Sequence, residues 1–178
     1  MTYKKASRRR IYAFLDIETT GLSPRYSRIT VVGIYLHDGL YGRFTQLVGE
    51  DITSDSLLHS LYGTDIIYTY NGSHFDLPYI NYQLGVNLAE LFRHDDLMYA
   101  CWRNSLKGGL KCVERQLGIE RQEKNVDGFE AVKLWRRYIA YNDDEALATL
   151  LRYNREDVLN LKTLREILAD RARCNQED

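Results

Sequence analysis

Asp16 and Glu18 are two carboxylates placed two residues apart at the end of an apolar segment, residues 11–17. In a β-strand, successive side chains alternate between the two faces, so both carboxylates project to the same side. Two like charges held a few ångströms apart repel each other unless a cation lies between them. Carboxylate oxygens are hard ligands that suit Mg²⁺ or Mn²⁺. The pair therefore indicates a divalent-cation site, with a solvated strand end as the alternative for a D-x-E pattern taken alone.

Asp76 is a third acidic residue, and the sequence leaves two roles open for it. It ends the run Asn71-Gly-Ser-His-Phe-Asp76, which follows a short apolar segment and opens a predicted helix. A carboxylate in that position often caps the free backbone N–H groups of the helix. The neighbouring Asn71 and Phe75 also suit the wall of a cleft that contains the carboxylate.

Tyr153 and Asp157 stand four residues apart in a long helical segment, residues 145–169, and therefore share one helix face. A phenol and a carboxylate on one face can both reach into a cleft. The structural alternative is a half-buried tyrosine with the aspartate on the solvent side. Asn154 and Glu156 fall on other faces of this helix.

The elements that must position these residues follow from the apolar periodicity. Residues 11–17, 29–36, 41–48 and 65–70 are predicted strands. Residues 55–62, 110–117, 129–141 and 145–169 carry apolar residues at helical spacing, and residues 76–83 start a helix with Pro78 in its first turn. Strands early in the chain and helices late predict an α/β fold with one mixed central β-sheet flanked by helices.

Length and composition exclude several classes of protein. The chain has 178 residues, 24 Lys and Arg against 25 Asp and Glu, a net charge of −1 and three cysteines. We expect a single domain over residues 1–178, with a basic tail at 1–9 and flexible residues at 171–178. No apolar run approaches the roughly 20 residues of a membrane span, so no membrane partner is expected. The widely spaced cysteines indicate neither a disulfide framework nor a zinc site, and a cytoplasmic location is expected.

Basic residues gather in three places despite the net charge. The first two clusters are Lys4, Lys5 and Arg8–Arg10, and Lys133, Arg136 and Arg137 beside Trp135 and Tyr138. Basic and aromatic side chains together contact phosphates and stack on bases, although an amphipathic helix with a solvated basic face also explains the second cluster. The third, Lys107-Gly-Gly-Leu-Lys111, precedes a predicted helix. Its glycines let backbone N–H groups approach an anion, and a flexible helix entry explains it equally well.

Taken in order, the patterns D-x-E, N-x-x-x-F-D and Y-x-x-x-D resemble those of a known family. They lie in Phe14-Leu-Asp-Ile-Glu-Thr-Thr-Gly-Leu22, Tyr70-Asn-Gly-Ser-His-Phe-Asp-Leu-Pro78 and Tyr153-Asn-Arg-Glu-Asp157. These segments resemble the DEDDy branch of the DnaQ-like 3′–5′ exonucleases, which have the ribonuclease H-like fold. Within that superfamily, Leu106-Lys-Gly-Gly-Leu-Lys-Cys-Val-Glu-Arg-Gln-Leu-Gly118 and Leu134-Trp-Arg-Arg-Tyr138 are similar to the YprB-type domains. The resemblance extends from about Arg10 to Leu168.

The resemblance implies a role for each motif residue. Asp16, Glu18 and Asp157 would hold one divalent cation, and Asp16 would bridge to a second cation that Asp76 helps to bind. Tyr153 would orient the attacking water. The residues implied to meet the terminal nucleotide or line its cleft are Thr19, Thr20, Gly21, Leu22, Asn71 and Phe75. Two such cations, about 3.5–4 Å apart, would stabilise both the attacking and the leaving oxygen of phosphodiester hydrolysis.

The function expected from the sequence is a 3′–5′ exonuclease that uses two divalent cations, Mg²⁺ or Mn²⁺, on single-stranded 3′ ends and releases 5′-mononucleotides. DNA is the first choice of substrate and RNA the close second, because no residue can be assigned to a 2′-hydroxyl. The alternatives are a structure-selective endonuclease on the same fold and a catalytically silent module that binds nucleic acid or a partner. The chain could act alone, as a homo-oligomer or in a larger repair or processing complex.

Overall fold

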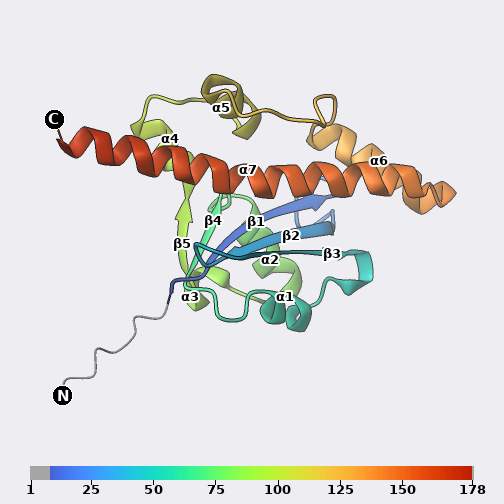
Figure 1. Ribbon diagram of the computed structural model, residues 1–178. Coiled ribbons are helices and arrows are strands. Elements are labelled where there is room, and N and C mark those ends of the chain that lie inside the picture. The colour runs from blue at the N-terminus through green and yellow to red at the C-terminus, as the bar shows by residue number, and fades with distance from the viewer. Residues whose placement is uncertain (1–8, 178) are drawn as a thin grey trace, which may run out of the picture.

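A computed structural model describes residues 9–177, and within them five strands form one sheet (Figure 1). The strands are β1 (Tyr12–Thr19), β2 (Ile29–His37), β3 (Gly42–Val48), β4 (Ile66–Thr69) and β5 (Arg93–Asp96), in the spatial order β3-β2-β1-β4-β5. The β1–β2 and β2–β3 pairs are antiparallel, whereas the β1–β4 and β4–β5 pairs are parallel. The sheet is therefore mixed, as predicted. Of the N-terminal basic cluster, Lys4, Lys5 and Arg8 lie outside the described residues.

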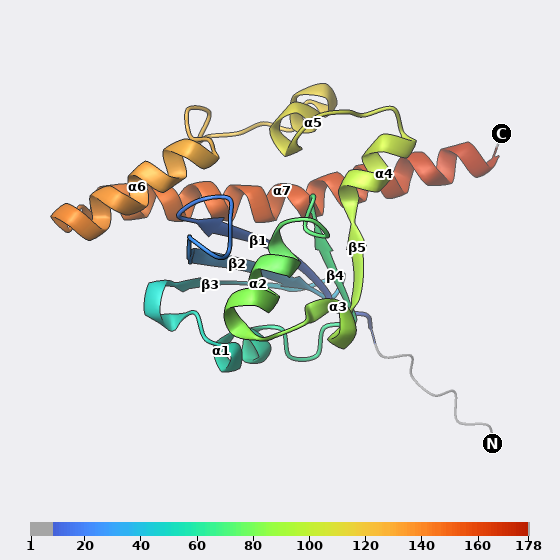
Figure 2. The ribbon, with the colours of Figure 1, turned by 180° about the vertical axis from the view of Figure 1, so that it is seen from behind.

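Helices cover both faces of the sheet. On one face lie α1 (Ser54–Ser60), α2 (Asp76–Leu84) and α3 (Leu88–Leu91), with the 3-10 turn η1 (Gly49–Asp51) before α1. On the other lie α4 (Leu97–Arg103), α5 (Leu110–Leu117), α6 (Gly128–Tyr141) and α7 (Asp144–Glu177). The long α7 crosses the sheet, and α5 and α6 pack beside it (Figures 1 and 2). The predicted α/β fold, a mixed central sheet flanked by helices, is confirmed.

The alternation of β1 decides which way its carboxylates face. The odd-numbered apolar residues of β1 pack into the core between the sheet and α1–α3, which they share with Ile80 of α2. Phe14 packs into the core on the opposite face, together with Val158 of α7. Asp16 and Glu18 lie two and four residues after Phe14 and therefore share its face of the sheet, so both carboxylates project toward α7.

Close packing of α7 on the sheet depends on Gly33 in β2. A Cβ atom at this position would overlap with Asn154 Oδ1 and lie 2.8 Å from Val158 Cγ2, both of which belong to α7. Gly33 is also the β2 partner of Asp16 in the β1–β2 ladder. The missing side chain therefore lets α7 approach the sheet at the level of the Asp16 carboxylate.

Two parts of the structure differ from the sequence prediction. The prediction lacks β5 and the helices α3 and α4 on either side of it, because the four residues of β5, Arg93-His-Asp-Asp96, are polar and show no apolar alternation. Helix α7 continues past residue 169 to Glu177, through most of the segment 171–178 that was expected to be flexible. Although α7 is long, no helix within residues 9–177 is apolar enough to span a membrane.

Candidate functional site

Three carboxylates meet where the end of β1 faces α7. One oxygen from each of Asp16, Glu18 and Asp157 lies within 4.8 Å of the other two. Glu18 is 6% exposed and Asp157 is 5% exposed, so both are largely removed from water. The strand brings the first two carboxylates to one side, and α7 brings the third across the same face of the sheet. We refer to these three residues as the carboxylate cluster.

Burial and mutual repulsion act together on the carboxylate cluster. Burial is the larger cause for Asp16 and for Glu18, followed by the negative charge of Asp157, and the pKa of both groups is raised well above the usual range. Burial raises the pKa of Asp157 to about 6, against the opposing effect of the Arg121 guanidinium. A cluster of this kind is stabilised by bound protons or by a cation.

Asp76, the first residue of α2, lies at the wall of the adjoining pocket and not within the carboxylate cluster. Its Oδ1 accepts a hydrogen bond from the backbone N–H of Ile17 at 3.1 Å. Phe75 occupies the N-cap position of α2, and no side chain caps that end of the helix. Burial raises the pKa of Asp76 to about 7. The carboxylate is therefore tied to β1, and three of the four predicted metal ligands converge while the fourth faces them from the pocket wall.

Asn154 belongs to the site, although the sequence analysis placed it on another face of α7 and assigned it no role. It is fully buried, and its Nδ2 donates a hydrogen bond to Asp16 Oδ2 at 3.0 Å. Its Oδ1 accepts a hydrogen bond from Gln46 Nε2 of β3, also at 3.0 Å. The available signal in the sequence was its place in the apolar stripe of α7, four residues after Leu150 and four before Val158.

Arg121 brings a positive charge to the carboxylate cluster from the loop between α5 and α6. Its side chain is 8% exposed and forms ion pairs with Asp157, with Glu114 at 2.7 Å and with Glu156 at 3.4 Å. Glu114 of α5 is fully buried and also accepts a hydrogen bond from Asn160 Nδ2 at 2.9 Å. No pattern in the sequence pointed to Arg121, because a single arginine in a loop has no spacing that reveals its partners.

Tyr153 lies beside the carboxylate cluster, one turn before Asp157 on α7. It is 7% exposed, and its hydroxyl group hydrogen-bonds with Asp157. Burial raises the pKa of Tyr153 well above its ordinary value, so the phenol keeps its proton. Lys111 Nζ lies 4.5 Å and Arg121 Cζ 5.5 Å from the centroid of its ring. The tyrosine is thus a protonated hydroxyl group held at the edge of the cluster.

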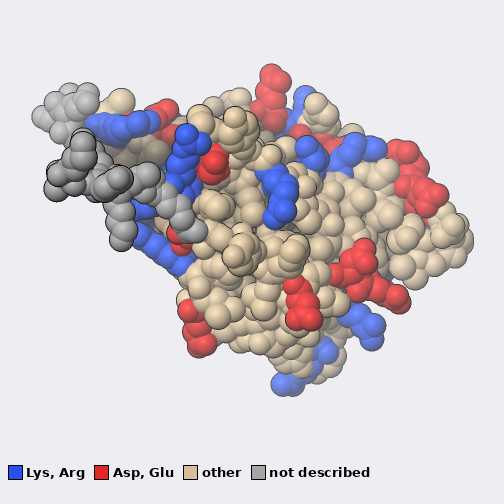
Figure 3. All heavy atoms as spheres, turned by 60° about the horizontal axis from the view of Figure 1, so that its bottom comes forward, with Lys and Arg blue, Asp and Glu red and all other residues tan. Residues whose placement is uncertain are grey.

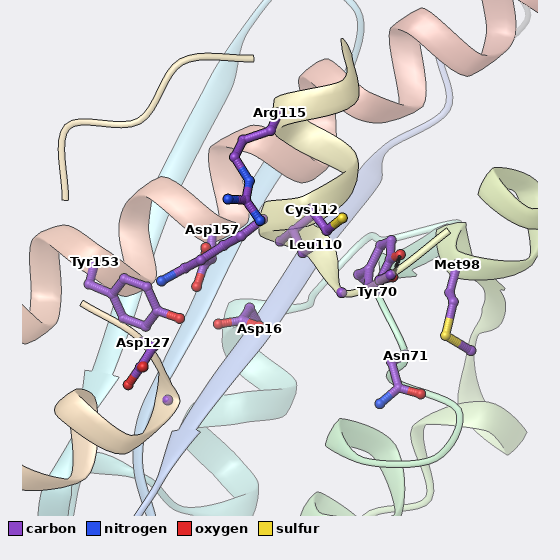
Figure 4. A pocket seen from close by; sticks show the side chains of 14 residues that line it. Asp16, Tyr70, Asn71, Met98, Leu110, Cys112, Arg115, Asp127, Tyr153 and Asp157 are labelled. Carbon is purple, nitrogen blue, oxygen red and sulfur yellow. Dashed lines mark hydrogen bonds between the residues drawn. The ribbon is translucent and has the colours of Figure 1, made fainter. Parts of the chain in front are cut away.

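Two pockets open beside the carboxylate cluster, and both are lined by Asp16, Tyr153 and Asp157. One has a volume of about 500 Å³, and its apolar lining consists mainly of Leu22, Phe75, Phe129 and Val132. The other has a volume of about 660 Å³ and is lined by the cationic Lys111 and Arg115 (Figure 4). We call these the apolar pocket and the basic pocket. The basic pocket also carries the carboxylates of Asp16, Asp127 and Asp157, so its two cations stand among acidic groups.

Five of the six residues implied to contact or surround a nucleotide line the apolar pocket: Thr19, Gly21, Leu22, Asn71 and Phe75. Thr20 does not line it, and its hydroxyl accepts a hydrogen bond from the backbone N–H of Arg28 at 2.9 Å. The Gly21 carbonyl accepts from Thr19 Oγ1 at 2.7 Å and from the Tyr79 hydroxyl at 3.0 Å. The turn is held in place, and Leu22 stands 87% exposed at the pocket rim.

The loop that carries Asn71 is held by Asp96, a buried carboxylate that the sequence analysis did not single out. Its oxygens accept hydrogen bonds from the backbone N–H groups of Asn71 at 2.8 Å, Ser73 at 3.0 Å and Met98 at 3.1 Å. Asn71 adopts a left-handed backbone conformation with φ of 63°. Asp96 therefore fixes this wall of the pockets and caps α4 with the same carboxylate.

The donor set of the carboxylate cluster fits a hard divalent cation. Carboxylate oxygens are the ligands that Mg²⁺ and Mn²⁺ prefer, and no soft ligand stands among the three. Asp16, Glu18 and Asp157 would hold such a cation, with Asp76 available at the wall of the apolar pocket. Arg121 already pairs with Asp157, so a cation would share that carboxylate with a guanidinium.

Known proteins are similar to this chain in sequence or in fold. The sequence profile of the RNase H superfamily matches residues 13–169. The uncharacterized protein MJ0365 of Methanocaldococcus jannaschii is 26% identical over 181 residues, which cover 89% of this chain and 95% of that protein. The family B DNA polymerase of Pyrobaculum calidifontis has a TM-score of 0.66 and 19% identity over 90% of this chain, which spans only 24% of the polymerase. Brucella melitensis NrnC with bound Mg²⁺ has a TM-score of 0.59 and 18% identity, over 97% of this chain and 78% of NrnC. At these identities the two solved structures share the fold.

Proposed function

The chain belongs to the RNase H superfamily, and we propose that it is a metal-dependent 3′–5′ exonuclease acting on single strands. It hydrolyses the phosphodiester bond at the 3′ end and releases 5′-mononucleotides. It uses two divalent cations, Mg²⁺ or Mn²⁺, and acts on DNA first, with RNA as the close second. Residues 1–178 act as one domain, and segments 106–118 and 134–138 support a place among the YprB-type domains.

The observation that carries this proposal is the convergence of Asp16, Glu18 and Asp157 within 4.8 Å beside two pockets. A buried acidic cluster repels a polyanion unless cations neutralise it. The apolar pocket offers Leu22 and Phe75 to a nucleoside on one side of the cluster. A single-stranded end can enter such a pocket with its last base unstacked, which supports action on terminal nucleotides.

Each residue of the site has a separate role in the proposed hydrolysis. Asp16, Glu18 and Asp157 would hold the first cation, and Asp76 together with Asp16 would help to hold the second. When bound, the cations lower the pKa of water and stabilise negative charge on the attacking and leaving oxygens. The Tyr153 hydroxyl, which keeps its proton, orients the attacking water. Asn154 holds the Asp16 carboxylate by a hydrogen bond and so keeps it directed at the cluster.

The proposal is tested with purified protein and a 5′-labelled single-stranded oligonucleotide in Mg²⁺, in Mn²⁺ and in EDTA. We expect a ladder that shortens from the 3′ end in one or both metals and no cleavage in EDTA. A circular single strand of the same sequence stays intact, since it has no end. Cleavage of the circle would instead identify an endonuclease, and an RNA strand run in parallel establishes the preferred sugar.

One observation favours a second candidate function, a module that binds nucleic acid without cleaving it. Arg121 pairs with Asp157 and thereby brings a positive charge of the chain itself to the carboxylate cluster. A cluster compensated in this way can persist in a protein that has no catalytic cation. Binding of the labelled strand without shortening, in Mg²⁺ and in Mn²⁺, would support this candidate and contradict the first.

A further inference from the structure

The basic pocket is lined by the last four residues of the segment Lys107-Gly-Gly-Leu-Lys111, to which the exonuclease proposal gives no role in the reaction. Gly108 and Gly109 line the pocket with their backbone, and the carboxylates of Asp16 and Asp157 line it as well. The Tyr70 hydroxyl donates a hydrogen bond to the Gly108 carbonyl at 2.5 Å, which ties this segment to the end of β4. The segment is therefore held beside the carboxylate cluster.

Arg115 presents a positive charge to this pocket. It lies on α5 one turn after Lys111, and its side chain extends into the pocket in Figure 4. No hydrogen bond or ion pair of its guanidinium is formed with any of residues 9–174. An exposed, unpaired arginine in a pocket can bind a phosphate with two parallel hydrogen bonds.

Other basic residues that were candidates for phosphate contact are paired or, like Arg136 of α6, line neither pocket. In the α6 cluster, Lys133 pairs with Glu130 at 2.9 Å and Arg137 pairs with Asp143 at 2.6 Å. On the face formed by α1 and α3, basic and acidic side chains are interspersed around a broad uncharged area (Figure 3). The basic pocket thus combines a free cation with direct contact to the carboxylate cluster.

Lys111 adds a second positive charge at a fixed place in the same pocket. Its Nζ donates a hydrogen bond to the Val126 carbonyl and lies 4.5 Å from the ring centroid of Tyr153. An ammonium group has three N–H donors, so Val126 leaves two of them for another acceptor. The ammonium therefore lies on the wall of the basic pocket beside Tyr153, with two donors left for an acceptor.

The remaining charged group on the pocket wall is Asp127, whose carboxylate caps the N-terminus of α6. Its Oδ1 accepts hydrogen bonds from the backbone N–H groups of Phe129 at 2.9 Å and Glu130 at 2.8 Å, which caps α6. The pKa of Asp127 is lowered, chiefly by the hydrogen bond from Glu130. The Asp127 Oδ1 is thus held at the start of α6, while the charge of this carboxylate also acts on Lys111. The guanidinium of Arg115 has no such partner among residues 9–174.

We propose that Lys111 and Arg115 bind the phosphate group that lies on the 5′ side of the scissile phosphodiester. This inference rests on the proposed function, because it takes the scissile bond to lie at the carboxylate cluster. With the terminal nucleoside in the apolar pocket, the rest of the strand leaves the cluster through the basic pocket. The preceding phosphate then meets the two cations of α5, which offset its repulsion by the carboxylates.

A pair of dinucleotides, one with and one without a 5′-phosphate, tests this site directly. In a dinucleotide the 5′-phosphate is the group that precedes the scissile bond. We expect the wild-type protein to show a KM about tenfold lower for the phosphorylated dinucleotide, with a similar kcat. In Arg115→Gln this difference shrinks to a few-fold at most, because only the phosphorylated substrate loses a contact. Arg43→Gln, an exposed arginine on β3 that lines neither pocket, is the matched control and keeps the wild-type difference.

Binding of the same dinucleotides in EDTA separates this site from the catalytic proposal. The phosphorylated dinucleotide should bind about tenfold more tightly to the wild-type protein, and Arg115→Gln should remove that preference. For a longer single strand, Arg115→Gln should also reduce the slope of log affinity against log salt by about 0.7. The site would be overturned if Arg115→Gln weakened the binding of both dinucleotides equally. It would also be overturned if the wild-type protein showed no preference for the phosphorylated dinucleotide in either KM or affinity. A retained binding preference without any turnover would overturn the exonuclease and leave the phosphate site standing.

Discussion

The side-chain amide of Asn154 donates a hydrogen bond to the Asp16 carboxylate at 3.0 Å, which joins the middle of α7 to β1 at the candidate metal centre. The approach is possible because Gly33, the β2 partner of Asp16, has no side chain beneath the helix. The buried side chain of Asn154 joins α7 to a second strand as well, since its Oδ1 accepts a hydrogen bond from Gln46 of β3. The geometry of the carboxylates thus depends on residues that bind neither metal nor substrate.

Replacement of Asn154 by leucine should destabilise the fold. The change removes the donor to Asp16 and one of the two acceptors of Gln46, whose Nε2 still donates to the Leu151 carbonyl. A buried polar group left unpaired costs about 1–3 kcal/mol. Urea unfolding measures this loss. Thr163→Ala, an exposed position on the same helix, should change stability by less than about 0.5 kcal/mol. An Asn154→Leu protein as stable as the wild type would contradict the role of this hydrogen bond.

Replacement of Gly33 by alanine should displace α7 from the sheet. The added methyl group overlaps with Asn154 and crowds Val158, and overpacking of this kind costs about 1–3 kcal/mol. Gly109→Ala is the matched control for stability, because an added Cβ there meets nothing within 4 Å. Equal unfolding midpoints for the two variants would show that the packing of α7 on the sheet does not require a glycine at position 33.

Asp157→Ala and Tyr153→Phe should affect catalysis to different extents. Loss of Asp157 removes a metal ligand and should abolish cleavage of the labelled strand. Loss of the Tyr153 hydroxyl removes only the group that orients water and should reduce kcat by about 10²-fold. Asp170→Asn, an exposed carboxylate further along α7, controls for the loss of charge and should cleave normally. Near-wild-type rates for both site variants would refute the assignment.

Divalent metal should stabilise the protein more at pH 8 than at pH 5.5. The pKa of Asp157 is raised to about 6 and that of Asp76 to about 7, above their values in an unfolded chain. The stability that these protonated groups contribute is therefore present below about pH 4 and lost as pH rises through about 6 to 7. Thermal unfolding in EDTA should show this decline, and Mg²⁺ or Mn²⁺ should reverse it where protons no longer compete. Equal increases in Tm at both pH values would argue against metal binding by these carboxylates.

Replacement of Arg121 by methionine should destabilise the protein more than the loss of a surface ion pair does. The guanidinium compensates the fully buried Glu114 as well as Asp157, and removal of one partner from a buried pair costs about 3–5 kcal/mol. The double variant Arg121→Met and Glu114→Met should recover part of this loss, because the buried charge of Glu114 is then gone while Asp157 still lacks its partner. Urea unfolding in EDTA compares the two variants, and an unrecovered double variant would mean that packing and not charge is responsible.

Local patterns in the sequence were enough to predict the mixed α/β architecture and the main chemical groups of the candidate site. Regular alternation in β1 and helical spacing in α7 are local properties, and they decide which side chains share a face. For this reason the sequence placed Asp16 with Glu18 and Tyr153 with Asp157 on common faces. It did not reveal β5, because an edge strand made of polar residues has no alternation to detect.

The polar residues that support those groups could not be predicted, because they are brought together by the packing of elements that are distant in the chain. Asn154 and Asp16 are separated by 138 residues and Arg121 and Asp157 by 36, so no local spacing records either contact. Whether a polar side chain faces solvent or a buried partner depends on how closely two elements pack, which for α7 is decided by a glycine on β2. Local periodicity therefore specified which side chains share a face of β1 or of α7. Packing between elements that are distant in the chain specified their hydrogen-bond and ion-pair partners.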